Sequence, residues 1–475
     1  MLTTICPQAT LWDAILPEEC RSLPAGLAEI DELLDDPRFF EPFRPFFHPT
    51  RGRRSIPMEW FLRLMYLRFR YKLGYEPLCR EVTDSLAWRR FCRIPLGVDV
   101  PHPSTLEKIV SRCGEKAIEA LNEALLAKAA ENKVLRLDAV RSDTTVLPAN
   151  VAYPTDSGLL ARGVAKMAAN IKKLKDLGLA ARTTTRDRTR SVRRRAHNIA
   201  VWLRRRNDDA KEEVRVIIGE LADIATVAAA EARVVAVNAR RTLARRGVTA
   251  TGQAEALVED LERTATLIEA IVAQTRVRLA GGVPDGSTRI VSLHDPDARP
   301  IAKGRLGKPV EFGYKAQLSD NVDGIVVDHA VFKGNPPDAP MLAPAISRIK
   351  RRFGRAPKKV TADRGYGEAG VDTQVEALGV KTVVIPRKGK PGIARQKVQR
   401  GRGFVKLVKW RTGCEARVAC VKRDWGWSRT LMDGEHGAAT WAGWGIFGHN
   451  TNKISALVAK RTGPPGQVPA RKQAG

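Results

Sequence analysis

The residues of this chain best suited to chemistry are Arg411, Glu415 and Lys422. If this segment is helical, their spacing of four and then seven residues places all three on one face of a 3.6-residue period. A carboxylate held between two cations suits a polyanion reacting at Mg²⁺, because the carboxylate binds the metal while the cations bind phosphate oxygens. An ordinary surface pair of Arg and Glu has the same spacing, so the assignment depends on the residues that accompany it.

Two further acids, Asp143 and Asp363, are associated with predicted strands. Asp143 lies within residues 134–146, whose alternation of aliphatic and polar side chains predicts a strand. Asp363 directly follows a second predicted strand over 358–362. Ligands gather at the carboxyl ends of strands in open α/β sheets, so this position favours a functional role for Asp363.

Asp143, Asp363 and Glu415 are separated by 220 and 52 residues, so only the fold can bring them together. Three carboxylates at one point repel each other unless divalent cations lie between them, which predicts Mg²⁺ or Mn²⁺ as the cofactor. Two such ions, about 3.5 to 4 Å apart, activate a water or a 3′-hydroxyl and stabilise the leaving oxygen of a phosphodiester. The implied chemistry is phosphodiester chemistry on DNA.

The charge of the chain points to the same partner. The 475 residues carry a net charge of +29, with 81 Lys and Arg against 52 Asp and Glu. Such an excess attracts polyanions over a long range, so double-stranded DNA is the expected partner. A hydrophobic content of 43% predicts folded cores rather than a basic tail.

Targeting and redox signals are weak. No run of 18 apolar residues predicts a membrane span, and the beginning of the chain lacks the basic and apolar regions of a signal peptide. We therefore expect a cytoplasmic, nucleoid-associated protein with no membrane partner. The seven cysteines are scattered without a C-x-x-C pair, which favours neither a zinc site nor a disulfide framework.

The first part of the chain is predicted to be a leader and basic linker over 1–54 and an all-helical DNA-binding domain over 55–130. Ser104 and Glu107 have capping-box spacing at the start of its last helix. The cations of this domain predict a compact basic unit of the helix-turn-helix type, although other basic bundles share the pattern. These cations are Arg63, Arg68, Arg70, Lys72, Arg80, Arg89, Arg90 and Arg93.

Residues 131–156 are predicted to be the first part of an α/β core, and residues 157–282 a long, basic helical insertion. Within the insertion, residues 182–206 hold ten arginines and one acid, Asp187, a net charge of +9. The solvated face of a helical hairpin is also charged, but one acid against ten cations favours contact with the DNA backbone. The arginines predicted to contact phosphate are Arg193, Arg194, Arg195, Arg204, Arg205 and Arg206.

The core is expected to resume over 283–455, with strands first and alternating helices and strands later, which predicts a mixed α/β sheet. A basic loop rich in Gly and Pro is predicted over 387–403, and a disordered tail over 456–475. The later strands are predicted over 288–294, 310–318, 324–332, 358–362 and 381–385.

Four motifs in a fixed order carry a family resemblance. The runs Asp143-Thr144-Thr145-Val146 and Asp363-Arg364-Gly365-Tyr366, with the spacing Arg411-x3-Glu415-x6-Lys422, resemble the DDE transposases of bacterial insertion sequences, in the group with a Tyr-Arg-Glu-Lys signature. The segment from Ser55 to Thr105 is similar to the helical domain that precedes their catalytic core. The resemblance covers about residues 50–455.

The resemblance implies an RNase H-like core in which Asp143, Asp363 and Glu415 are the catalytic, metal-binding triad. It implies that Arg411 and Lys422 contact DNA phosphate. It further implies a transposase that binds the terminal inverted repeats of its element, cleaves DNA with two divalent metals and transfers the 3′-OH ends into target DNA, as a homodimer. The signature tyrosine would fall at Val408, and Trp410 is the nearby aromatic residue that could replace it.

Other assignments stay open on the sequence alone. Asp138 and Asp156 compete with Asp143 for the role of the first acid, and Glu435 competes with Glu415 for the third. A non-catalytic DNA-binding protein, such as a decayed or co-opted transposase acting as a repressor, is one alternative function. An RNase H-like nuclease is another. A tyrosine or serine recombinase is disfavoured, because no nucleophile with an associated Arg and His cluster is recognisable.

Overall fold

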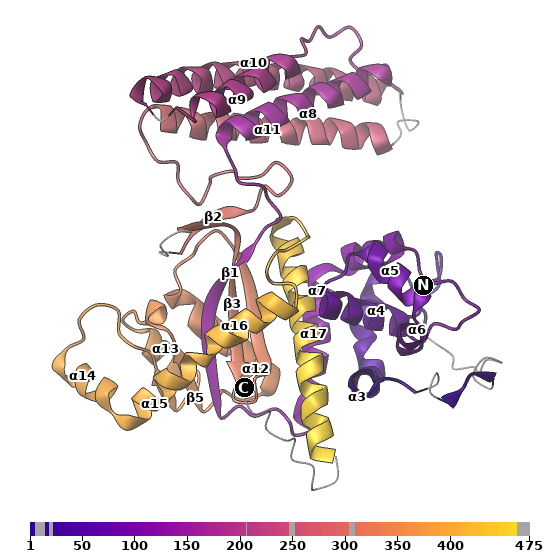
Figure 1. Cartoon of the computed structure of the whole chain (residues 1–475), viewed down its shortest axis with the longest axis vertical. Helices are drawn as coiled ribbons and strands as arrows, with labels where there is room; N and C mark the ends of the chain where they lie inside the picture. The colour runs from indigo at the N-terminus through magenta and orange to yellow at the C-terminus, as the bar shows by residue number, and fades with distance from the viewer. Residues whose placement is uncertain (5–14, 19–21, 206, 247–251, 304–308, 463–475) are drawn as a thin grey trace.

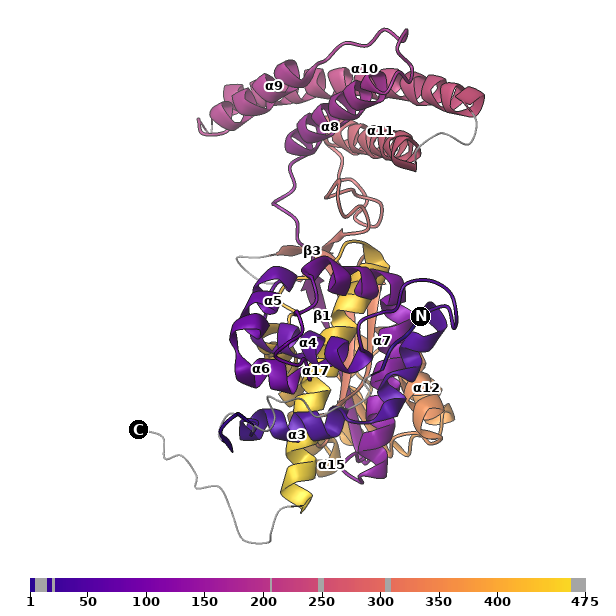
Figure 2. The same cartoon turned by 90° about the vertical axis from the view of Figure 1, so that its right-hand side faces the viewer.

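The structure is a computed structural model of the chain, and it describes residues 1–4, 15–18, 22–205, 207–246, 252–303 and 309–462. A mixed sheet lies at the centre, the N-terminal helices lie on one side of it, and a separate helical bundle stands beyond one end (Figures 1 and 2). The mixed α/β fold predicted from the sequence is confirmed.

The sheet joins an antiparallel half to a parallel half. Its order is β4-β3-β1-β5-β6, and β2 lies end to end with β4 along the outer edge of β3. β1 pairs antiparallel with β3 and parallel with β5, and β6 continues the parallel half. The strands are β1 (Ala139–Pro148), β2 (Arg299–Ala302), β3 (Val310–Asn321), β4 (Val326–Lys333), β5 (Lys359–Ala362) and β6 (Thr382–Val384).

Helices cover both faces of the sheet, which explains why β3 is buried from Gly313 to Asn321 despite its polar side chains. α16 and α17 lie on one face and α12 on the other, while α7 runs beside α17 (Figures 1 and 2). The elements around the sheet are α7 (Pro103–Glu131), η4 (Ala339–Met341), α12 (Leu342–Phe353), η5 (Arg364–Tyr366), α13 (Val371–Ala377), α16 (Gly413–Asp424) and α17 (Gly434–Thr462).

The N-terminal helices share one hydrophobic core with the sheet. α17 packs against α3, α4 and α7, so the two regions are joined by a continuous apolar contact rather than by a linker. The prediction of a leader over 1–54 is wrong for its second half, because Leu34, Phe39 and Phe43 are fully buried. The elements are α3 (Ala25–Leu34), η1 (Pro37–Phe39), η2 (Glu41–Phe46), α4 (Met58–Tyr71), α5 (Tyr75–Asp84) and α6 (Leu86–Phe91).

Three of the cations predicted to form a DNA-reading surface are instead part of this core. Arg63 is fully buried and pairs with Asp31 at 2.6 Å. Arg68 lies over the ring of Tyr75 at 4.0 Å, and Arg89 donates to backbone carbonyls. A buried guanidinium needs such partners, so these arginines stabilise the fold. The exposed cations of the set are Arg70, Lys72 and Arg80.

Two local predictions are wrong for identifiable reasons. α7 begins at Pro103, and His102 rather than Ser104 accepts the capping hydrogen bond. Residues 288–294 form no strand, because Gln274 hydrogen-bonds both the N–H and the carbonyl of Ile290 and holds this segment against α11.

Four helices form the bundle over residues 156–279, where the sequence predicts a helical insertion. The bundle has its own hydrophobic cluster, which includes Leu160, Leu221, Val258 and Ile268 and shares no residue with the main core. It is inserted between β1 and β2 and connects to the sheet through two segments of chain (Figure 1). Its helices are α8 (Asp156–Asp176), α9 (Thr189–Trp202), α10 (Asp208–Arg246) and α11 (Gly252–Leu279).

Two predictions for the C-terminal part are wrong. Most of the basic segment predicted as a loop over 387–403 is helical, forming α14 (Ile393–Arg400) and the start of α15 (Arg402–Arg411). The tail predicted from residue 456 remains part of α17 as far as Thr462, because Ile454 anchors this turn in the core. Residues 463–475 lie outside the described residues. None of the helices in the described ranges is long and apolar enough to cross a membrane.

We predict that residues 154–294 fold when expressed alone, because the bundle encloses a hydrophobic cluster that owes nothing to the sheet. Circular dichroism should show a helical spectrum and a single cooperative thermal transition. Replacing the buried Ile268 with Asp should abolish that transition. A broad, non-cooperative melt of the wild-type fragment would contradict the prediction.

Candidate active site

Strand register brings Asp143 and Asp363 together. β1 and β5 are parallel, and their last paired residues are Ser142 and Ala362. The next residue of each strand is an acid, so the two carboxyl groups leave the paired region side by side, on strands about 4.8 Å apart. The Asp363 carboxylate accepts the N–H of Gly365 at 2.9 Å, which fixes the turn into η5.

A further acid, Asp338, lies against the same turn. Its carboxylate accepts the hydroxyl of Thr144 at 2.9 Å and pairs with Lys315 at 2.6 Å. A Cβ added to Gly365 would meet Asp338 Oδ2 at 2.7 Å and Asp363 Oδ1 at 3.0 Å, so glycine is needed between the two carboxylates. Sequence analysis missed Asp338 because an Asp between prolines is typical of a turn.

The third predicted acid approaches through Arg411. The Arg411 guanidinium lies 3.5 Å from Asp143 Oδ2 and 3.6 Å from Glu415 Oε1, so it bridges the two acids. The Glu415 side chain is 71% exposed, against 13% for Asp143. Arg411 is the last residue of α15, and Glu415 and Lys422 belong to α16. Thr412 between the two helices keeps right-handed helical dihedrals, so Arg411 and Glu415 stay one turn apart.

The junction of α15 and α16 is tied to the central strand by a buried ion pair. Arg141 of β1 makes two hydrogen bonds to Asp320 of β3, at 2.7 and 2.8 Å, and Asp320 is completely buried. The same guanidinium donates to the carbonyl of Trp410 at 2.7 Å. Arg417 of α16 also reaches Asp320, at 3.3 Å. These contacts fix the backbone positions of the helix ends that carry Arg411 and Glu415.

Burial of the carboxylates of the cluster, and their repulsion of one another, raise the pKa of two of them. Burial, with the neighbouring charges of Asp363 and Glu415, raises the pKa of Asp143 to about 6, against the opposing effect of the Thr144 N–H and Arg411. Burial and the charge of Asp338 also raise the pKa of Asp363, and Arg411 opposes them. The site therefore holds more negative charge than one guanidinium compensates.

The donor set fits a hard divalent cation such as Mg²⁺ or Mn²⁺. Carboxylate oxygens are the ligands these ions prefer, and a dication would offset the charge that raises the pKa of Asp143 and Asp363. Within the described part of the chain, no three Asp, Glu, His or Cys side chains are close enough to share one ion. Arg411 lies between the first and third acids instead, so metal binding would require this side chain to move.

The competing acids lie elsewhere in stable pairings. Asp138 pairs with Lys358 at 2.8 Å. Asp156 starts the bundle, where it pairs with Arg278. Glu435 accepts the N–H of Lys333 at 3.0 Å. None of the three is part of the cluster around Asp143 and Asp363.

Comparison with known families agrees with this geometry. One family model, described as a Transposase domain (DUF772), matches residues 16–112, and a second, described as a Transposase DDE domain, matches residues 285–450. Together they cover more than half of the chain. The chain belongs to the DDE transposases of insertion sequences.

The core of the transposase is RNase H-like, as the resemblance implied. A curated relative, an uncharacterized protein named ORF8 in the nfe locus of Rhizobium meliloti, is 29% identical over 141 residues, which is 29% of this chain and 68% of the relative. No solved structure matched the chain.

The arginines predicted to contact DNA from the bundle of the transposase differ in their surroundings. Arg193, Arg194 and Arg204 are exposed. Arg195 pairs with Glu220 at 2.7 Å, and Arg205 lies over the ring of Trp202 at 4.1 Å. Arg206 lies outside the described residues. Trp202 is therefore packed against its own neighbour.

Val408 and Trp410 of α15 are the two residues considered for the place of the signature tyrosine. Val408, at the position of the signature tyrosine, is half-buried. The ring of Trp410 lies 4.7 Å from the guanidinium of Arg141, which covers it. Trp410 is thus used to hold α15 on the sheet of the transposase.

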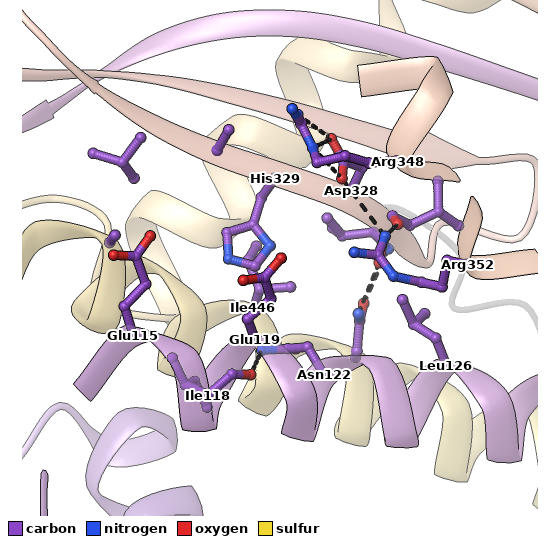
Figure 3. Close-up of a pocket in the computed structure, with 16 residues that line it drawn as sticks. Glu115, Ile118, Glu119, Asn122, Leu126, Asp328, His329, Arg348, Arg352 and Ile446 are labelled. Carbon is purple, nitrogen blue, oxygen red and sulfur yellow. Dashed lines mark hydrogen bonds and ion pairs between the residues drawn. The ribbon is translucent and has the colours of Figure 1, made fainter. Parts of the chain in front are cut away.

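One cavity of the structure is remote from the acids. It has a volume of about 180 Å³ and lies between α7, β4, α12 and α17, where Glu119, Asn122, Arg348 and Arg352 line it (Figure 3). The pKa of its His329 falls to about 3, because of burial and of the charges of Arg352 and Arg348. No predicted site residue lines this cavity.

Asp143→Asn should stabilise the transposase in the absence of metal. The folded pKa of about 6 lies above the ordinary value of 3.8, so the folded state binds more protons between these values and stability falls as pH rises from about 4 to about 6. Asn removes this loss, worth about 1 to 3 kcal/mol at pH 7. Thermal unfolding in EDTA should show it.

Two controls sharpen that measurement. Well below pH 3.8 the stabilities of the two proteins should converge, because Asp143 is then protonated in both the folded and the unfolded state. Mn²⁺ should raise the Tm of the wild type more than that of Asp143→Asn, since a ligand of the folded state stabilises it. A variant less stable than the wild type at pH 7 in EDTA would contradict the electrostatic account.

Asp320→Asn should destabilise the transposase by about 3 kcal/mol, because it leaves Arg141 buried without its carboxylate. The loosened junction of α15 and α16 should also lower DNA cleavage measured below the new Tm. Glu41→Gln, which breaks the exposed pair with Arg44, is the control and should leave the free energy of unfolding close to that of the wild type. Equal effects of the two substitutions on the free energy of unfolding would show that the buried pair has no special role.

Proposed function

We propose that this transposase binds the terminal inverted repeats of its element, hydrolyses a phosphodiester there and transfers the freed 3′-OH into target DNA. The observation that carries the proposal is the register of β1 and β5, which sets Asp143 beside Asp363, with Glu415 linked to them through Arg411. We propose these three acids as the catalytic, metal-binding triad.

The chemistry divides between bound ions and the side chains of the chain. Two divalent ions, when bound, would supply the activation of water or a 3′-hydroxyl and the stabilisation of the leaving oxygen. Asp143 and Asp363 would hold them from the rigid sheet. Glu415 would complete the set from α16, where its exposure leaves it free to turn inward.

Arg411 changes partner in this proposal. In the metal-free protein it compensates Asp143 and Glu415. With the acids holding ions, the Arg411 guanidinium would be available to a phosphate oxygen, for which its planar fork is well suited. Lys422, seven residues beyond Glu415 on α16, would contact phosphate further along the strand.

Recognition of DNA would involve two other regions. Arg70, Lys72 and Arg80 form the exposed basic part of the N-terminal helices, which we propose to bind the element ends. Arg193, Arg194 and Arg204 of the bundle would contact the backbone nearby. We propose a homodimer at the nucleoid as the working form, since two ends must be joined to one target.

A repressor without catalysis is less well supported, because it has no need of opposed carboxylates whose burial raises the pKa of Asp143 and Asp363. An RNase H-like nuclease shares the acids, but it does not require an N-terminal helical domain of the transposase type. Competition between repeat ends and random duplex distinguishes a transposase from such a nuclease.

Asp363→Asn should abolish cleavage of element ends in Mg²⁺, with a loss of at least about 10³-fold, because a metal ligand contributes several kcal/mol to the barrier. Asn keeps an oxygen that accepts the Gly365 N–H, so the turn should survive. Gel-shift affinity for the ends should stay within about twofold of the wild type.

Asp138→Asn is the matched control. It removes a carboxylate just before the first paired residues of β1 and β5, at the end of this strand pair opposite to Asp363, where Asp138 pairs with exposed Lys358, and it should leave cleavage intact. Cleavage retained by Asp363→Asn would remove the triad proposal. Binding without cleavage by the wild type in Mg²⁺ or Mn²⁺ would favour the repressor.

A further inference from the structure

The helical hairpin formed by α14 and α15 is strongly basic. From Arg387 to Arg411 the chain carries ten Lys and Arg residues and no acid. The hairpin extends from the sheet, on the side away from the N-terminal helices (Figure 1). No side chain of α14 or α15 is buried, so the hairpin contributes little to the core.

The cations at the base of the hairpin have structural partners. Arg387 and Arg395 pair with Asp372, at 3.3 and 3.0 Å, and Lys388 pairs with Glu368 at 3.1 Å. Apart from Arg411, the others are exposed and form no ion pair within the described residues. These six, which we call the hairpin cations, are Lys390, Lys397, Arg400, Arg402, Lys406 and Lys409.

Three of the hairpin cations lie in a line. Arg402, Lys406 and Lys409 follow each other at i, i+4 and i+7 along α15, which puts them on one face over about 10 Å. Leu407 and Arg411 are half-buried, on the side of α15 that packs against β5 and β6. The exposed line therefore faces solvent, and the opposite side holds the hairpin on the sheet.

The base of α15 lies within the acid cluster. Its last residue, Arg411, is 3.5 Å from Asp143, and β5, which it packs against, leads directly to Asp363. A backbone held along the hairpin cations would thus be held next to the carboxylates. A second copy of this chain would be a poor occupant, because each copy carries a net charge of +29.

We propose that the α14–α15 hairpin is a binding surface for the phosphate backbone of duplex DNA, which it holds beside Asp143 and Asp363. The proposal rests on the proposed function only for the identity of that duplex, which would be the target. The contact reads no sequence, since exposed Lys and Arg side chains on a helix meet phosphates as charges.

The test compares two triple variants of the full chain with equal changes in charge. Arg402→Gln/Lys406→Gln/Lys409→Gln removes the line on α15. Arg351→Gln/Lys350→Gln/Lys381→Gln removes one Arg and two Lys that are exposed, the first two in the last turn of α12 and the third just before β6. Binding of a 30-base-pair duplex of random sequence is measured between 50 and 200 mM KCl, together with strand transfer into that duplex.

The hairpin variant should bind the duplex about tenfold more weakly at 0.1 M salt, and the slope of log K against log salt should fall by two to three, close to one unit for each phosphate that the variant no longer neutralises. The control should keep the wild-type slope within one unit. Helical content and Tm should match in all three proteins.

The outcomes separate this inference from the proposed function. Equal slopes for the hairpin and control variants would overturn the inference, even if the wild type cleaves element ends. A reduced slope only for the hairpin variant would support it, even if no variant performs strand transfer. A change of oligomeric state with an unchanged slope would overturn it in favour of contact between copies.

Discussion

The site depends on one buried ion pair, Arg141 with Asp320, between the two central strands of the sheet. Burying both charges is costly unless every donor and acceptor is matched, and here Arg417 and the carbonyl of Trp410 complete the set. Trp410 belongs to α15, and Arg417 belongs to α16. Because the buried charges need these two partners, the ion pair fixes the positions of the helices that carry Arg411 and Glu415.

The sheet edge and the helix junction contribute differently to the site. Asp143 is held by its pairing with β3, and Asp363 caps the turn that directly follows β5. Glu415 lies in the first turn of α16, and its side chain is exposed. Asp143 and Asp363 are thus placed by the sheet, whereas the exposed Glu415 side chain is the one that could change position if the proposed ions bind.

Sequence reasoning was reliable where local pattern and position agreed. The alternation around Asp143 predicted β1, and the strand ending at Asp363 predicted the edge where the acids meet. The side-by-side placement depends on the register of β1 and β5, which no local pattern contains. Asp338 was missed because its role comes from Thr144 and Lys315, which are remote in the chain.

Charge was harder to interpret than hydrophobic pattern. Arg63 and Arg89 look like DNA contacts in the sequence, yet burial commits them to the fold. The arginines of α14 and α15 are not buried, but only the three-dimensional structure distinguishes them from the buried ones. Their Gly and Pro neighbours had predicted a loop rather than helices. A cation predicts a partner of opposite charge, but not whether that partner is another molecule.

The position of Arg411 has a consequence for biogenesis. Two of the three acids already have a positive neighbour built into the polypeptide, so a nascent molecule can reach its native shape without waiting for an inorganic counterion. Folding and the binding of ions then become separate events. Under the proposed function, the transposase would therefore fold first and become competent to cleave only when ions displace Arg411 from the acids.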